Sequence, residues 1–204
     1  MVIILPFAEK DGIFHYNSTL VIDANGKILG TYRKIHIPAY FTTDLKGGTG
    51  SFERLYFAPG NLGFPIFNTA FGRLGVQICY DRMYPEGYCS LALKGAEIVY
   101  NPTNYATYGL NYRVKAWGRL LIARAYENGF FVVAPNKAGV ENGRNNVGRS
   151  LIISPIGGEI LAEAQTEKDE LIVAGVDLDD VIKAHRRLPF WCDRRPDQYK
   201  VLLY

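Results

Sequence analysis

The sequence predicts a layered α/β sandwich whose sheets mix parallel and antiparallel strands. Apolar runs of strand length are separated by two segments with helical spacing, so helices and strands should pack in layers around one core. Several of these runs are continuously apolar rather than alternating, which is typical of sheets covered on both faces. Other runs flank short glycine-containing turns, which indicates hairpins and therefore mixed sheets.

The first half of the chain supplies five predicted strands and one long loop. A turn at Asn25-Gly26, expected to be of type I′, joins the second and third strands. Residues 39–60 are rich in glycine and should form a long surface loop, a kind of segment that often carries function. The strands are predicted at residues 2–6, 17–23, 27–34, 67–71 and 73–79.

All predicted helices lie after residue 84. Residues 85–94 and 112–128 have helical spacing, and Gly95 and Gly129 follow them as C-caps. A third helix should begin near residues 177–180. Further strands are predicted at residues 96–100, 130–135, 150–154, 158–163 and 171–176.

We expect residues 1–204 to form one domain. Residues 186–204 are rich in Pro, Trp, Tyr and Arg, so we interpret them as a C-terminal extension that packs at a subunit interface of a homo-oligomer. No apolar run approaches the ~20 residues that span a bilayer. The net charge of +3 is scattered, which argues against a nucleic-acid partner. Three cysteines without metal-ligand spacing indicate a reducing compartment, so a cytoplasmic protein is expected.

Cys79 ends an apolar strand and is followed by polar residues and by Pro85-Glu86, a helix-start signal. A nucleophile at a strand-to-helix turn is presented at the sheet edge, next to backbone N–H groups that can bind an oxyanion. The positive end of a helix would also favour the thiolate. The alternative is a buried small hydrophobe, which most free cysteines are. The local pattern leaves both interpretations open.

Lys34 closes the third predicted strand, and Glu53 lies inside the long loop. Taken alone, each is typical of a solvated surface residue, and composition does not connect either to Cys79. The histidines at positions 15, 36 and 185 do not lie at metal-ligand spacing and are interpreted as structural.

Four sequence blocks connect these residues. They are YRKIHIP (32–38), FERLYFAPGNLGFP (52–65), FGRLGVQICYDRMYPE (71–86) and GAEIVYNP (95–102). Together they resemble, in order, the signature blocks of the nitrilase superfamily of carbon–nitrogen hydrolases. Lys34 and Glu53 are 19 positions apart, and Lys34 and Cys79 are 45 apart, as in that family. The resemblance extends over essentially the whole chain.

The resemblance implies an α-β-β-α sandwich and a Glu-Lys-Cys mechanism without a metal or cofactor. Cys79 would be the nucleophile that attacks the amide carbonyl, and Lys34 would stabilise the oxyanion. Glu53 would hydrogen-bond near the lysine and position the substrate. The backbone N–H of Tyr80 would be a second oxyanion donor.

The family's general-base glutamate lies upstream of the strand at residues 2–6. We therefore expect the N-terminal part of the family domain to be missing, on the order of 60–80 residues if each β-α unit takes ~30. Its absence should expose sheet edges and apolar surface. Glu9 follows the first strand, but it matches a different family position and is a poor substitute for the base.

Within the superfamily the chain most resembles N-carbamoyl-amino-acid amidohydrolases and β-ureidopropionases. By position, Arg82 would bind the substrate carboxylate, and Asn104 would contact the substrate. Met83 replaces a second arginine of that pattern, and Tyr80 and Tyr105 also depart from it. The expected reaction converts an N-carbamoyl amino acid to the amino acid, CO2 and ammonia.

Other interpretations remain open. A β-ureido acid or a simple amide are alternative substrates, whereas Arg82 argues against a cationic one such as a carbamoylated polyamine. A truncated remnant that keeps the fold without catalysis is an alternative of a different class.

Overall fold

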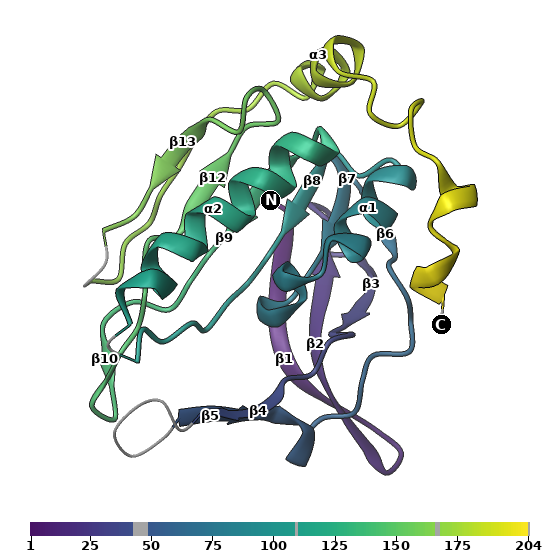
Figure 1. Ribbon diagram of the computed structural model, residues 1–204. Helices are drawn as coiled ribbons and strands as arrows, with labels where there is room; N and C mark the ends of the chain where they lie inside the picture. Colours follow the sequence, from purple (N-terminus) through teal and green to yellow (C-terminus); the bar gives the residue numbers. More distant parts are fainter. Residues whose placement is uncertain (43–48, 109, 166–167, 204) are drawn as a thin grey trace.

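The computed structural model describes residues 1–42, 49–108, 110–165 and 168–203. Two sheets and a pair of helices stack in layers (Figure 1). The helices cover one face of the larger sheet, and the smaller sheet packs on its other face. The predicted α/β sandwich with mixed sheets is confirmed. No helix in the described chain is long and apolar enough to cross a bilayer.

Among the described residues the larger sheet has six strands in the order β13-β12-β9-β8-β7-β6. The centre is parallel, because β7, β8 and β9 pair in the same direction, whereas the outer strands pair antiparallel. A helix makes each parallel connection. The strands are β6 (Ile66–Thr69), β7 (Gly72–Val76), β8 (Ile98–Tyr100), β9 (Phe131–Ala134), β12 (Leu151–Ile153) and β13 (Ile160–Glu163).

Helices α1 (Pro85–Leu93) and α2 (Asn111–Asn128) lie close to their predicted bounds. Proline suits the first turn of α1 because its φ is preset and it has no N–H to leave unpaired. Gly129 ends α2 in the left-handed conformation, with φ of 66°. Trp117 and Leu121 of α2 are buried against the sheet and form the larger of two hydrophobic clusters.

The smaller sheet is antiparallel and consists of β1 (Ile3–Asp11), β2 (Phe14–Ile22) and β3 (Ile28–Arg33). The first strand was predicted to stop at residue 6, and it continues to Asp11. The buried Arg33 donates to Glu9 (Nε–Oε2, 3.0 Å) and to Asp11 (Nη2–Oδ2, 2.8 Å). The hydrogen bonds from Arg33 lower the pKa of the Glu9 carboxyl. A partner on β3 therefore lets the polar end of β1 stay in the sheet.

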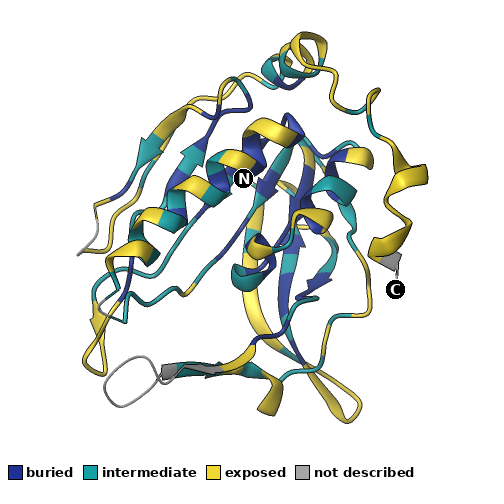
Figure 2. Ribbon diagram, in the orientation of Figure 1, coloured by how far each residue is buried: buried dark blue, intermediate teal, exposed yellow. Residues whose placement is uncertain are grey.

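The outer face of the smaller sheet is apolar. Ile3, Leu5 and Phe7 alternate along β1 and are exposed, whereas Ile4 between them packs into the second hydrophobic cluster. Figure 2 shows β1 as a largely exposed strand beside the buried core. The expected exposed apolar surface is thus present on this face.

The predicted type I′ turn at Asn25-Gly26 is wrong. Such a turn requires positive φ at both central residues. Gly26 has φ of 84°, but Asn25 does not have positive φ. The Gly26 N–H donates instead to the Asp23 carbonyl at 2.9 Å, and the Asn25 side chain accepts from the Lys27 N–H at 3.0 Å. Because the Asn25 side chain satisfies this backbone group, the turn does not need the mirror-image form.

The segment predicted as a long loop, residues 39–60, contains a short hairpin. Strands β4 (Ala39–Thr42) and β5 (Thr49–Phe52) pair antiparallel, and residues 43–48 between them lie outside the described residues. A 3₁₀ turn at Glu53–Leu55 follows β5. The rest of the segment has no regular structure, so the loop prediction holds only for residues 56–60.

The predicted strand at residues 171–176 is also wrong. Leu171 and Val173 are 89% and 79% exposed, and no strand of the described chain pairs with this segment. A continuous apolar run becomes a strand only where a neighbouring backbone can pair with its N–H and C=O groups. Helix α3 (Asp179–Arg187) then forms as predicted. In the C-terminal extension, the Trp191 ring lies edge-on to His185 at 5.7 Å; its interface role stays a prediction.

Replacing either of two glycines by alanine should change the free energy of unfolding, in opposite directions for the two positions. A Cβ at Gly60 would lie 2.1 Å from the Arg33 carbonyl oxygen, so Gly60→Ala should lower the free energy of unfolding by at least about 2 kcal/mol through overpacking. A Cβ at Gly118 in α2 would meet Leu151 at an ordinary 3.7 Å, so Gly118→Ala should raise it by about 0.5–1 kcal/mol. Urea unfolding of both variants tests this; a neutral Gly60→Ala would contradict the close approach.

Candidate active site

Cys79 lies where the chain leaves the parallel part of the larger sheet. Strand β7 ends at Val76, and Cys79 begins a 3₁₀ turn, Cys79–Met83, before α1 starts at Pro85. The predicted strand-to-turn position is confirmed. The helix-dipole argument needs correction, because this short turn separates Cys79 from the N-terminus of α1. Any favourable dipole at the thiol comes from the turn alone.

The backbone of Cys79 is strained. Its φ is 48°, a left-handed conformation that costs a non-glycine residue about 1–3 kcal/mol. Three contacts hold it in place. The Cys79 N–H donates to the Pro102 carbonyl at 2.9 Å, and the Cys79 carbonyl accepts from Arg82 Nη1 at 2.8 Å. The Asp81 N–H donates to the Ile78 carbonyl at 3.0 Å and closes the turn. The half-buried thiol is thereby fixed at the sheet edge.

Lys34 and Glu53 form an ion pair. The Lys34 side chain is 0% exposed, and Nζ donates to Glu53 Oε2 at 2.7 Å. Asn17 on β2 contacts the same oxygen at 3.4 Å. A buried ammonium needs such a partner, because an unpaired charge in the protein interior is costly. Glu53 directly follows β5, so the hairpin β4–β5 places it next to the lysine at the end of β3.

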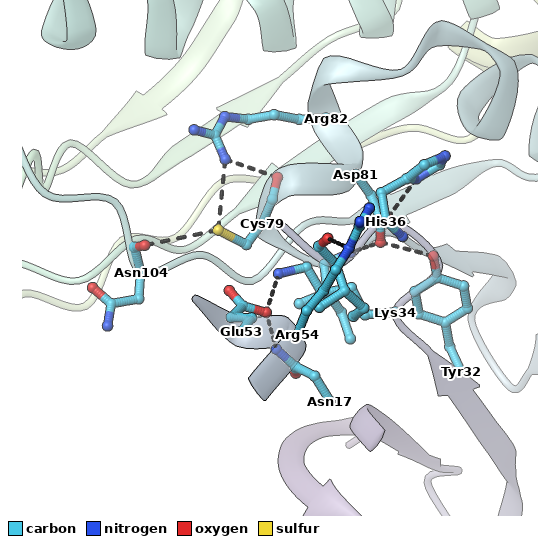
Figure 3. A network of polar contacts seen from close by, with 12 residues as sticks. Asn17, Tyr32, Lys34, His36, Glu53, Arg54, Cys79, Asp81, Arg82 and Asn104 are labelled. Atoms are coloured by element: carbon cyan, nitrogen blue, oxygen red, sulfur yellow. Dashed lines mark hydrogen bonds and ion pairs between the residues drawn. The ribbon is translucent and has the colours of Figure 1, made fainter. Parts of the chain in front are cut away.

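A cavity of about 1010 Å³ brings the predicted site residues together. Cys79, Glu53 and Asn104 all line it, with Asn17 at its wall. Lys34 is not on the surface of the cavity but lies behind Glu53. Figure 3 shows the Lys34 side chain reaching toward Glu53, with Cys79 close to this pair. Two segments that are far apart in sequence thus meet around one open space.

The structure does not place Arg82 as a carboxylate ligand. Its side chain is buried, and the residue is 3% exposed and does not line the cavity. The guanidinium stacks 4.1 Å from the centre of the Tyr105 ring and 5.4 Å from that of Trp117. It donates to the Cys79 carbonyl, and Nη1 lies 3.7 Å from Sγ. Arg82 therefore supports the nucleophile turn, and the argument from Arg82 against a cationic substrate fails.

Asn104 and Tyr80 have different surroundings. Asn104 lines the cavity, and its backbone carbonyl faces the Cys79 thiol at 3.7 Å, so contact with a substrate stays a prediction for it. The Tyr80 ring packs among other tyrosines, 6.1 Å from Tyr40 and 5.5 Å from Tyr84, away from the cavity wall. Its backbone N–H sits in the first turn, where an N–H has no partner within the turn, as an oxyanion donor requires.

Glu9 does not reach the site. Its carboxylate pairs with Arg33 and accepts from Ser18 at 2.6 Å, on the opposite face of the small sheet from Lys34. The carboxylates that line the cavity within the described chain are those of Glu53 and Glu141. Among the same residues no group of three or more His, Cys, Asp or Glu side chains could hold a metal ion.

Sequence reasoning missed Asp81. This fully buried carboxylate accepts hydrogen bonds from the segment that carries Lys34 and from the turn that carries Cys79. The available signal was spacing: His36 follows Lys34 by two residues, and Asp81 follows Cys79 by two. His36, interpreted as structural, is one of its partners.

Comparisons with known proteins find similar sequences over nearly the whole chain. A family model described as carbon-nitrogen hydrolase matches residues 1–186. N-carbamoylputrescine amidase of Arabidopsis thaliana is 39% identical over the whole chain, which spans 69% of that protein. Citrullinase of Francisella tularensis is 35% identical over 97% of the chain and 69% of its own length.

Solved structures agree as well. A carbon-nitrogen hydrolase from Helicobacter pylori G27 superposes on the whole chain with a TM-score of 0.89 and 34% identity, and the match covers 71% of that chain.

Proposed function

Because the chain belongs to the carbon–nitrogen hydrolase family and is an amidohydrolase, we propose that it cleaves the carbamoyl group of an N-carbamoyl amino acid. The overall reaction is R–NH–CO–NH2 plus water to R–NH2, CO2 and NH3. One observation carries the proposal: Cys79 and Glu53 line a single cavity, and Glu53 holds the buried Lys34 ammonium at 2.7 Å. The relatives named for carbamoylputrescine and citrulline support a carbamoyl substrate over a simple amide.

The reaction has two stages, transfer of the carbamoyl group to Cys79 and its hydrolysis. The Cys79 thiolate forms a bond to the carbamoyl carbon, and the electron pair of the C=O bond moves to oxygen. The buried Lys34 ammonium and the Tyr80 N–H stabilise that oxyanion. The C–N bond to the amine then breaks as the amine nitrogen takes a proton. Water hydrolyses the remaining S-carbamoyl enzyme and regenerates the thiol, while the carbamic acid decomposes to CO2 and NH3.

Glu53 pairs with Lys34 and faces the substrate. A carboxylate at 2.7 Å offsets the cost of burying the positive charge that stabilises an oxyanion. The resemblance assigns the general base to a further glutamate that Glu9 does not replace. If the 204-residue chain acts alone, Glu53 or Glu141 is the cavity carboxylate that accepts the thiol proton.

We infer that Arg144, rather than Arg82, binds the substrate carboxylate. Arg144 on β11 (Arg144–Asn145) lines the same cavity as Cys79. Within the described chain, its guanidinium has no hydrogen-bond or ion-pair partner, whereas the nearby Glu141 is already paired with Lys137 at 2.5 Å. An unpaired guanidinium on the wall suits a carboxylate, because it can donate two parallel hydrogen bonds.

A carbamoylated diamine is the second candidate substrate. Burial of Arg82 removes the charge that argued against a cation, and Glu141 places a carboxylate on the cavity wall. The similarity to N-carbamoylputrescine amidases supports the same class. The two candidates differ in the charge at the end remote from the carbamoyl group.

The proposal is tested by ammonia release from a panel of substrates. The panel contains N-carbamoyl α-amino acids, N-carbamoyl-β-alanine, citrulline, N-carbamoylputrescine and a simple aliphatic amide. The same protein alkylated with iodoacetamide serves as the blank. Release from carbamoyl compounds, with little from the simple amide, is expected. No release from folded protein with any of these compounds would contradict the proposal and support the non-catalytic remnant.

Arg144→Gln separates the two candidate substrates. Loss of a charged hydrogen bond to a carboxylate should raise KM for N-carbamoyl amino acids about tenfold. KM for N-carbamoylputrescine should stay the same or fall, because a like charge is removed. Steady-state kinetics on both substrates provide the measurement. An unchanged KM for the carboxylate substrates would exclude Arg144 as their partner.

A further inference from the structure

Asp81 is a buried carboxylate with four hydrogen-bond donors around it. Oδ2 accepts from the Tyr32 hydroxyl at 2.8 Å and from the Ile78 N–H at 2.9 Å. Oδ1 accepts from the His36 N–H at 3.0 Å and lies 2.7 Å from His36 Nδ1. An ionised carboxylate offers only acceptors, so Nδ1 carries the proton in this pair. Every lone-pair direction of the 0% exposed side chain is thus used.

These donors come from two segments that carry the catalytic groups. Tyr32 and His36 flank Lys34, whereas Ile78 directly precedes Cys79. Figure 3 shows Tyr32 and His36 converging on Asp81 from the lysine segment. The contact is reinforced by the His36 ring, which stacks on Tyr84 at 3.8 Å with a 7° interplanar angle. A single carboxylate therefore ties the two halves of the site together.

The hydrogen bonds to Asp81 matter because the backbone next to them, at Cys79, is strained. Cys79 is held at φ of 48°, and the hydrogen bond from the Ile78 N–H to Asp81 fixes the residue before it. A strained residue persists only where its surroundings over-determine it. Asp81 does not line the cavity, so it does not touch a substrate there.

We propose that Asp81, with His36, is a positioning pair that sets the placement of Cys79 relative to Lys34. The inference rests on the proposed function, because it assigns the pair a role in that reaction. Burial and the Asp81 carboxylate also hold the pKa of Tyr32 well above its usual range, so its hydroxyl remains a donor. Asp81 acts through the turn and the lysine segment and contributes no proton to the reaction.

Asp81→Asn is the principal variant. It keeps the shape of the side chain but replaces one carboxylate oxygen with an NH2 group, which would then face the N–H and O–H donors that surround Asp81. A misplacement of about 1 Å can cost about 100-fold in rate, so kcat should fall by about that factor while KM changes little. His36→Ala should lower kcat in the same way. His36→Asn should restore much of it, since its amide can donate where Nδ1–H does. Tyr32→Phe removes a single donor and should have a smaller effect.

A second measurement does not depend on hydrolysis. The rate at which iodoacetamide alkylates Cys79, followed by mass spectrometry, should fall in Asp81→Asn, while the exposed Cys192 of the same chain keeps its rate. Val181→Ala, buried in α3 away from the site, is the control; it should lower Tm and leave both rates unchanged.

The outcomes are distinct. If Asp81→Asn lowers Tm but keeps the wild-type kcat and Cys79 alkylation rate, Asp81 only stabilises the fold and the inference is overturned. A wild-type chain that does not hydrolyse carbamoyl compounds sinks the proposed function, and the alkylation rates then decide the inference. If Asp81→Asn does not fold, the comparison of His36→Ala with His36→Asn gives the same test, because the His36 side chain is 24% exposed and its replacement should disturb the fold less.

Discussion

Replacing Cys79 by serine is expected to abolish ammonia release, with a loss in kcat of at least about 10⁴. Serine keeps the size of the side chain and its place in the strained turn, but its hydroxyl is a weak nucleophile without a strong base beside it. Binding should survive, because Arg144 and Asn104 on the cavity wall are untouched. Ammonia release and titration calorimetry with a carbamoyl substrate measure the two effects separately.

The chain supplies matched controls for this change. Cys89→Ser in α1 and Cys192→Ser in the C-terminal extension make the same substitution outside the cavity. Both should retain the wild-type kcat. If Cys79→Ser kept activity while Cys89→Ser lost it, the assignment of the nucleophile would be wrong.

Lys34→Met should lower kcat about 10³-fold while the protein stays folded. The change keeps length and volume but removes the charge that we propose stabilises the oxyanion, and the loss of one such donor costs about 10²- to 10³-fold. Removing one partner of a buried ion pair is destabilising, because the other charge is left unpaired. Glu53 loses its cation in this variant, so Tm should fall.

A double variant separates catalysis from stability. Adding Glu53→Gln to Lys34→Met removes the unpaired carboxylate and should recover Tm, yet activity should remain lost. Lys115→Met on the exposed face of α2 makes the same substitution without consequence for either quantity. A Lys34→Met protein that kept a kcat within about twofold of wild type would show that its ammonium does not stabilise the transition state.

Local chemistry was enough to predict the fold and part of the site. The strands around Gly72, both long helices and the strand-end position of Cys79 follow from spacing and from glycine and proline signals. These signals act between near neighbours in the chain, which is why a single sequence reveals them.

The errors arose where tertiary partners decide the outcome. Arg82 looked like a substrate ligand, but its guanidinium is withdrawn under Tyr105 and Trp117, the second of which comes from a helix more than thirty residues on. Residues 171–176 form a continuous apolar run of strand length without a partner among the described strands. The Lys34–Glu53 contact is present at 2.7 Å, but it was expected only from the family resemblance, because it depends on how the hairpin β4–β5 folds back.

The anchoring of Glu53 bears on how such a site can diversify during evolution. Glu53 is held by Lys34 at the end of β3 and by Asn17 on β2, and both of these contacts come from outside the hairpin β4–β5. Insertions or deletions in the connection between β4 and β5 would therefore remodel the cavity wall at Gly50 and Phe52 while the acid–amine pair stays in register. We therefore expect a change in the length of this one hairpin to alter which substrates fit the cavity while the Lys34–Glu53 pair is kept.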